Sequence, residues 1–141
     1  MHERNVTVAE SGNGPYGQFI TAGNHVIAAD EPVELAGRNT GPDPYELLLS
    51  ALGACTSMTI RMYADRRKLR LDRVEVRLRH AQRANTQSGL SDRFERTITL
   101  IGELTADDRQ KLLEIADKCP VSQTLQRSSV VASELADAAA G

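Results

Sequence analysis

One long apolar segment constrains the fold of this chain more than any other feature. Residues 43–46 read Asp-Pro-Tyr-Glu, an order that gives an N-cap aspartate, a proline at the first helical position and a glutamate three residues after the cap. The stretch ELLLSALGACTSMTI that follows is almost wholly apolar. The pattern predicts a helix over residues 44–68 that must be covered on most sides. One small domain supplies part of that cover, and a second chain could supply the rest.

The segments on both sides of this helix alternate between apolar and polar residues, which is typical of β-strands. A shorter amphipathic segment begins at Thr105, an N-cap residue followed by two aspartates. The expected elements are strands within 5–30, a helix over 44–68, strands within 71–102, a helix over 106–118 and a strand over 128–135. This order predicts a single domain over residues 1–141 of the α+β class, with antiparallel sheet and helices packed against it.

Composition and charge argue against several classes of function. The net charge is -2, from 17 Lys and Arg and 19 Asp and Glu, which does not favour nucleic-acid binding. The basic run at residues 61–70 is typical of the C-terminal end of a helix. The first ten residues show no apolar secretory segment, and the longest apolar run is too interrupted to span a bilayer. We therefore expect a cytoplasmic protein with no nucleic-acid or membrane partner.

The chain has two cysteines, Cys55 and Cys119. Neither they nor the three scattered histidines have metal-ligand spacing, so we expect no metal and no cofactor. Cys119 precedes Pro120 at a helix end, where the backbone N–H groups of a following helical turn would lower the pKa of the thiol. Cys55 lies within the long helix and would need a cation from elsewhere. The residues alone leave two interpretations open, a pair of packing cysteines or a working thiol pair.

Two motifs resemble those of the OsmC/Ohr superfamily, the osmotically inducible and organic-hydroperoxide-resistance proteins. They are GPDPYELLLSALGACTSMTIRMYA at 41–64 and LLEIADKCPVSQTL at 112–125. The resemblance implies an OsmC-like fold, an intertwined homodimer and thiol peroxidase chemistry. In that chemistry Cys55 attacks an organic hydroperoxide and becomes a sulfenic acid, and Cys119 resolves it as a disulfide. An external dithiol, such as a lipoyl group, then reduces the disulfide.

The resemblance also implies a glutamate and an arginine beside the attacking thiol. The family's glutamate position is Tyr45 in this chain, and Glu46 follows it. In a regular helix Glu46 lies on the opposite side from Cys55 and ~13 Å along the axis, so it would reach a thiol only from a partner chain. Its alternative role is the capping box. Arg38, in the loop before the helix, is the candidate arginine, and its alternative is an ordinary exposed loop residue.

A second function stays open at this point. Tyr45 at the glutamate position favours a non-catalytic module on the same fold, in which the cysteines sense oxidants slowly or the apolar cleft holds a small ligand. The predicted catalytic residues, which belong to the peroxidase interpretation, are Cys55, Cys119, Glu46 and Arg38.

Overall fold

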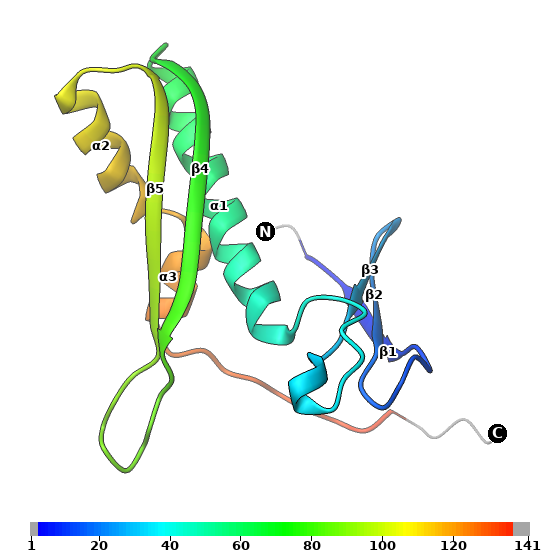
Figure 1. Ribbon diagram of the computed structural model, residues 1–141. Coiled ribbons are helices and arrows are strands. Elements are labelled where there is room, and N and C mark those ends of the chain that lie inside the picture. Colours follow the sequence, from blue (N-terminus) through cyan, green and yellow to red (C-terminus); the bar gives the residue numbers. More distant parts are fainter. Residues whose placement is uncertain (1–2, 137–141) are drawn as a thin grey trace. The chain divides into compact units, whose positions relative to one another are not determined.

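The computed structural model describes residues 3–136, and its contacts divide the chain into two compact units. The first unit contains the chain up to Ala54 together with Val76–Thr97, and the second contains Cys55–Glu75 and the chain from Ile98 onward. Three long elements contribute residues to both units (Figure 1). They are α1 (Pro44–Arg66), β4 (Arg70–Gln82) and β5 (Arg93–Glu103).

The first unit begins with a three-stranded antiparallel sheet in the order β1-β2-β3. Its strands are β1 (Val6–Glu10), β2 (Gln18–Ala22) and β3 (His25–Ala29), so all three lie within the 5–30 range that alternation predicted. A two-residue turn joins β2 to β3, and its Gly23 has a φ of +61°, a conformation that glycine adopts without steric cost. A single 3-10 turn, η1 (Val33–Leu35), lies in the loop that leads to α1.

Helix α1 starts as its sequence predicts and ends two residues earlier than expected. The backbone N–H of Glu46 donates to Asp43 Oδ1 at 2.8 Å, and the backbone N–H of Asp43 donates to Glu46 Oε1 at 3.0 Å. These two bonds form a capping box. The helix ends at Arg66 rather than residue 68 because Lys68 has a φ of +55°, a left-handed conformation that stops the helical ladder.

Among residues 3–136, α1 is the one helix long and apolar enough to cross a membrane by length and composition, with a mean hydropathy of 1.2. The core helix of a soluble protein passes the same test. Thr56, Ile60 and Ala64 are fully buried against the rest of the second unit, whereas Met58 and Met62 on the same helix are exposed. Helix α1 therefore packs as a core helix on one side and presents an apolar strip on another.

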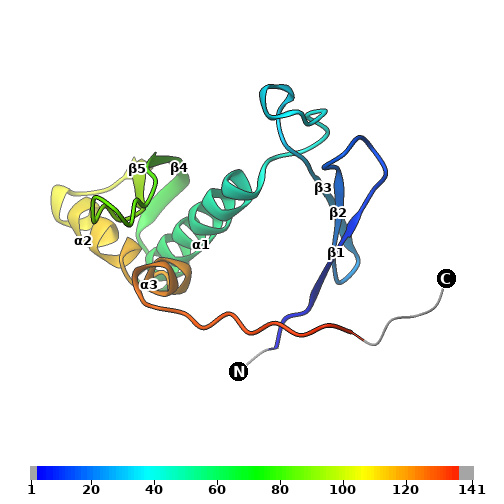
Figure 2. The ribbon, with the colours of Figure 1, turned by 90° about the horizontal axis from the view of Figure 1, so that it is seen from below.

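The core of the second unit lies between the C-terminal half of α1, the β4–β5 hairpin and α2 (Ala106–Ala116). Figures 1 and 2 show the hairpin lying over these helices. The core residues are Ile60, Ala64, Leu71, Leu112 and Ala116. Helix α2 begins at the predicted cap, because the Thr105 hydroxyl accepts from Asp108 N–H at 3.0 Å and Asp108 Oδ2 accepts from Thr105 N–H at 3.1 Å.

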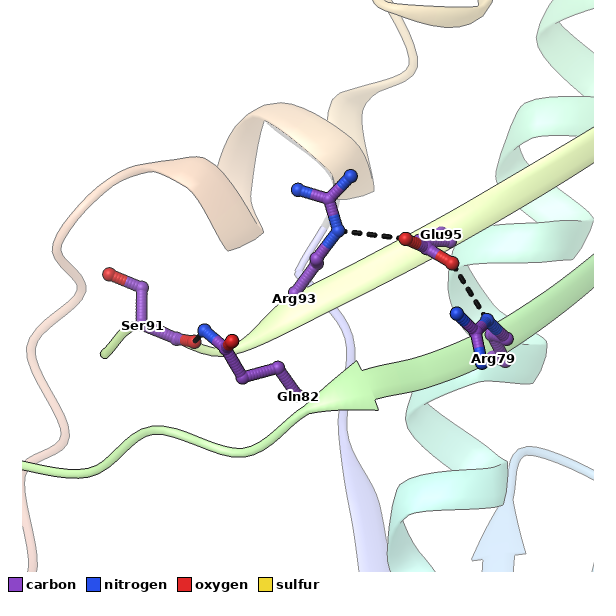
Figure 3. A network of polar contacts seen from close by, with 5 residues as sticks. All are labelled: Arg79, Gln82, Ser91, Arg93 and Glu95. Atoms are coloured by element: carbon purple, nitrogen blue, oxygen red, sulfur yellow. Dashed lines mark hydrogen bonds and ion pairs between the residues drawn. The ribbon is translucent and has the colours of Figure 1, made fainter.

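Polar contacts hold the free end of the β4–β5 hairpin in register. Glu95 accepts from Arg79 at 2.7 Å and from Arg93 at 2.8 Å, and the Gln82 side-chain amide donates to the Ser91 carbonyl at 2.7 Å (Figure 3). The two arginines are largely exposed, so these ion pairs add little stability. They serve to align the strands, because a slip of one residue would separate Arg79 from Glu95.

The predicted strand over 128–135 is wrong. Residues 128–136 form neither helix nor strand, and Val130, Val131 and Leu135 are each exposed by 89% or more. A strand requires a neighbouring edge to pair with, and no described strand pairs with this segment. The second helix ends at Ala116 rather than 118, and the chain turns there into α3 (Pro120–Gln126). The prediction of a single domain stays a prediction.

Candidate functional site

The structure brings together the two cysteines, which are far apart in sequence. Both are free thiols in the second unit, and they lie close enough for each to shift the pKa of the other. Helix α2 packs its Leu112 and Ala116 into the same core as Ile60 of α1, and this packing places the residues after α2 against α1. The backbone N–H of Cys119 still bonds to the Ala116 carbonyl at 3.2 Å, so the end of α2 fixes where Cys119 lies.

Cys119 occupies the N-cap position of α3, with Pro120 at the first helical position. Its φ of -56° and ψ of 124° place the backbone N–H groups of Val121 and Ser122 near enough to its sulfur to lower the pKa of the thiol. The Thr56 hydroxyl, from α1, donates to the same sulfur at 3.9 Å. Cys119 and Thr56 are both fully buried, whereas Cys55 is half-buried. One thiol is therefore sealed inside the unit and the other is open to small molecules.

The surroundings of the two thiols shift their pKa values in opposite directions. Burial acts to raise the pKa of Cys119, but hydrogen bonds from Cys55, Ser122 N–H, Thr56 and Val121 N–H together bring that pKa below its ordinary value. Burial raises the pKa of Cys55, and its bond to Cys119 raises it further, against smaller lowering by Val121 N–H and the Thr59 hydroxyl. Of the two thiols, Cys119 is therefore the more acidic.

A pocket of about 650 Å³ opens beside Cys55. Its lining residues are Cys55, Met58, Thr59, Met62, Tyr63, Arg66, Ile115, Lys118 and Pro120. The walls are mostly apolar, and two cations, Arg66 and Lys118, belong to the lining. A pocket of this volume is large enough for a small organic ligand. Because Cys55 is the cysteine in its lining, a ligand in this pocket would meet the Cys55 thiol and not that of the buried Cys119.

The two other predicted site residues belong to the first unit. Glu46 is exposed and takes part in the capping box of α1, which is the alternative role that its sequence position suggested. Arg38 is exposed too; its stem lies against Gly14 and its backbone N–H donates to Asp30 Oδ2 at 3.3 Å. Their proposed action on the thiols stays a prediction.

Tyr45, which stands at the family's glutamate position, has a structural environment of its own. Its ring stacks on His80 at 4.8 Å between centroids, and the Arg83 guanidinium lies 5.5 Å from its centre. His80 stacks in turn on Phe94 and bonds to Asp92 at 2.8 Å. In this chain the position is therefore part of an aromatic stack against the β4–β5 hairpin within the first unit.

Sequence reasoning missed the two threonines that act on the thiols: Thr56, which donates to Cys119, and Thr59, which lowers the pKa of Cys55. The sequence feature that marks them is a polar side chain inside an apolar helix, but this feature alone does not indicate which cysteine each threonine would approach. The pocket cations Arg66 and Lys118 were missed because they read as ordinary residues near helix ends. Within residues 3–136 no group of three or more His, Cys, Asp or Glu is placed to hold a metal.

Solved structures share this fold. An OsmC-like protein from Mycoplasma pneumoniae is 18% identical over 89% of this chain and 88% of its own, with a TM-score of 0.75. An organic hydroperoxide resistance protein OsmC from Legionella pneumophila is 20% identical, covers 89% and 90%, and has a TM-score of 0.64. A protein described as a putative organic hydroperoxide resistance protein from Vibrio cholerae, with captopril in one active site, is 21% identical, covers 89% and 85%, and has a TM-score of 0.63.

These likenesses show a mixed fold of helices and antiparallel sheet that OsmC-like proteins share. The model of the family described as OsmC-like protein matches residues 37–134, which include both cysteine motifs. The chain therefore belongs to the OsmC-like protein family. No curated protein matches it closely enough to add a more specific relative.

Proposed function

We propose that the protein is a cysteine-based peroxidase that reduces organic hydroperoxides to alcohols. The observation that supports this most directly is the proximity of Cys55, which lines an apolar pocket, to the buried Cys119, whose surroundings lower its pKa. Family membership supports the same chemistry, since some structural neighbours are named organic hydroperoxide resistance proteins.

In the proposed reaction Cys55 is the attacking thiol, because it is the cysteine that lines the pocket. Cys55 first gives up its proton, and the neighbouring Cys119, as the thiolate, accepts it. The Cys55 thiolate then attacks the distal oxygen of the hydroperoxide and the O–O bond breaks. The departing alkoxide takes the proton from Cys119 and leaves as the alcohol, so that Cys119 is again a thiolate. Cys55 becomes a sulfenic acid, which Cys119 converts to a disulfide. An external dithiol, for which we propose a lipoyl-type group, completes the cycle by reducing that disulfide.

Single-cysteine variants test the assignment of the two roles. Cys55→Ser should abolish turnover of cumene hydroperoxide with a dithiol reductant. Cys119→Ser should still consume one equivalent of hydroperoxide and should accumulate a sulfenic acid that dimedone traps on Cys55. Full turnover by Cys55→Ser, or dimedone labelling of Cys119 in preference to Cys55, would contradict the assignment.

We also propose that the working protein is a cytoplasmic homodimer. Support comes from the apolar residues that a single chain leaves exposed on α1, Met58 and Met62, and on the N-terminal sheet, among them Val6, Val8 and Val26. Exposed apolar side chains of this kind are candidates for burial in an interface between subunits. In a dimer a partner chain would also be the source of Glu46, which cannot reach Cys55 along its own helix.

A second candidate is a slow redox sensor or small-ligand module on the same fold. The raised pKa of Cys55, caused first by burial, favours it, because a protonated thiol is a poor nucleophile. The rate of a single oxidation separates the two functions. Fast oxidation of Cys55 by organic hydroperoxides supports the peroxidase, and uniformly slow oxidation by every peroxide supports the sensor.

A further inference from the structure

Each cysteine of the pair has a threonine side chain near it. Thr56 donates to Cys119 Sγ at 3.9 Å, and Thr59 is near enough to Cys55 to lower the pKa of that thiol. The distance at Thr56 is within the range of hydrogen bonds to sulfur, which are longer than those to oxygen. Both threonines lie on α1, one directly after Cys55 and the other one turn further on.

The Thr56 hydroxyl is buried, so its surroundings differ from those of a hydroxyl that water can reach. Thr56 has no exposed area, and neither has Cys119, so water does not compete for their contact. A hydrogen bond to an ionised acceptor is about twice as strong as one between neutral groups. The hydroxyl therefore favours the thiolate form of Cys119 and holds its sulfur against α1, where Cys55 lies.

We propose that Thr56 is a positioning residue for Cys119: its hydroxyl holds the buried sulfur beside Cys55 and stabilises the thiolate that closes the disulfide. The inference rests on the proposed function for its oxidant. In the closing step the Cys119 thiolate attacks the sulfur of the Cys55 sulfenic acid. The S–S bond forms, the S–O bond breaks, and its electron pair leaves with hydroxide, which takes up a proton to become water. The Cys119 sulfur is oxidised and the Cys55 sulfur is reduced.

The titratable groups near the two sulfurs determine which ionisation the pH dependence of disulfide closure measures. Thr56 donates to Cys119, and Cys55 and the N–H groups of Val121 and Ser122 also shift the pKa of Cys119. The charged side chains lining the adjacent pocket are Arg66 from α1 and Lys118 from the segment after α2. Among the residues that the structure describes, no histidine, aspartate or glutamate lines that pocket, so a change in the profile of closure between pH 5 and 9 reports the thiols.

The test measures closure separately from the attack on peroxide. Reduced wild type, Thr56→Val and Thr56→Ser each receive one equivalent of cumene hydroperoxide in the presence of dimedone. Mass spectrometry then gives the ratio of disulfide to dimedone adduct on Cys55 across pH. We expect Thr56→Val to close roughly tenfold more slowly, the effect of losing one hydrogen bond to a charged group, with its profile displaced to higher pH. Thr56→Ser restores the rate and the profile.

Thr99→Val is the matched control, because Thr99 is an exposed threonine on β5 in the same unit, and it should match wild type. The proposal is overturned if Thr56→Val closes at the wild-type rate with the wild-type profile, or if Thr56→Ser is as slow as Thr56→Val. Should the valine variant fail to fold, Thr56→Ala replaces it and is judged by the same outcomes, since alanine removes the hydroxyl without adding bulk to the helix.

A second oxidant separates failure of this inference from failure of the proposed function. Diamide, an azo oxidant, forms an adduct on a cysteine thiolate, and a second thiolate displaces its hydrazine to give the disulfide. If wild type ignores hydroperoxides, the proposed peroxidase function fails, yet closure by diamide still compares Thr56→Val with Thr56→Ser. Equal closure rates in that comparison overturn the role of Thr56 whatever the natural oxidant is.

Discussion

At the scale of single residues, local structure depends more on buried polar groups with several hydrogen-bond partners than on charged groups at the surface. Asp30 is an example outside the thiol site. It is 2% exposed and accepts bonds from the backbone N–H groups of Glu31, Arg38 and Thr40 and from the Thr40 hydroxyl. One carboxylate thus fixes the loop that contains Arg38. Sequence reasoning did not single out Asp30, because its partners come from a loop without a periodic pattern.

Asp30 gives a pH-dependent prediction. The hydrogen bond from the Thr40 side chain, opposed by burial and aided by three backbone N–H groups, lowers the pKa of Asp30 below its ordinary value of 3.8. Between the two values the unfolded chain binds more protons, so this contribution to the free energy of unfolding is complete above pH 3.8 and is lost as pH falls through the folded pKa. Urea unfolding should show a steeper acid loss for wild type than for Asp30→Asn. Identical slopes would contradict this.

Two glycines should respond differently to alanine. A Cβ at Gly37 would lie 1.9 Å from the Glu31 carbonyl oxygen, which is backbone, whereas a Cβ at Gly53 would meet the end of the flexible Leu78 side chain at 2.7 Å. We expect Gly37→Ala to lower the free energy of unfolding by about 2–3 kcal/mol and Gly53→Ala to change it by less than about 1 kcal/mol, since helix propensity offsets the contact. Equal losses in denaturant titrations would count against this account.

At the scale of elements, the sequence predicted well where the helices start and which segments are helical or extended. It predicted poorly which segments pair or pack with one another. Asp43 and Thr105 cap the helices where their residue types indicated, because capping depends on neighbours within four residues. The strand predicted over 128–135 failed because a strand depends on a partner that its own sequence does not specify. Likewise Pro120 indicated N–H groups near Cys119, whereas the contact with Thr56 depends on how α2 packs on α1.

The packing of α2 against α1 is what brings the cysteines together, and Leu112 tests it. Leu112 is fully buried, while its neighbour Leu113 is 51% exposed. Leu112→Ala should cost about 2–5 kcal/mol of stability, and Leu113→Ala, the matched control, less than about 1 kcal/mol. Thermal unfolding of both variants measures the difference. Similar losses at the two positions would show that the α1–α2 contact is not part of the core.

At the scale of the whole molecule, a single chain exposes several large apolar side chains whose burial would stabilise the protein. The exposed residues on α1 and on the N-terminal sheet would be buried by a second copy, as the length and apolar character of α1 suggested from the sequence. We therefore expect sedimentation equilibrium to give twice the mass of one chain at micromolar concentration. The mass of a single chain at those concentrations would contradict the proposed dimer. It would also contradict the proposal that Glu46 comes from a partner chain.

The most direct measurement of the central claim is the intact mass of the reduced protein after one equivalent of cumene hydroperoxide. The contact between Cys55 and Cys119 predicts the loss of two hydrogens within one chain, with both thiols blocked to alkylation and restored by a dithiol. An unchanged mass with two alkylatable thiols, or added oxygen on Cys55 with Cys119 still reduced, would contradict a working pair.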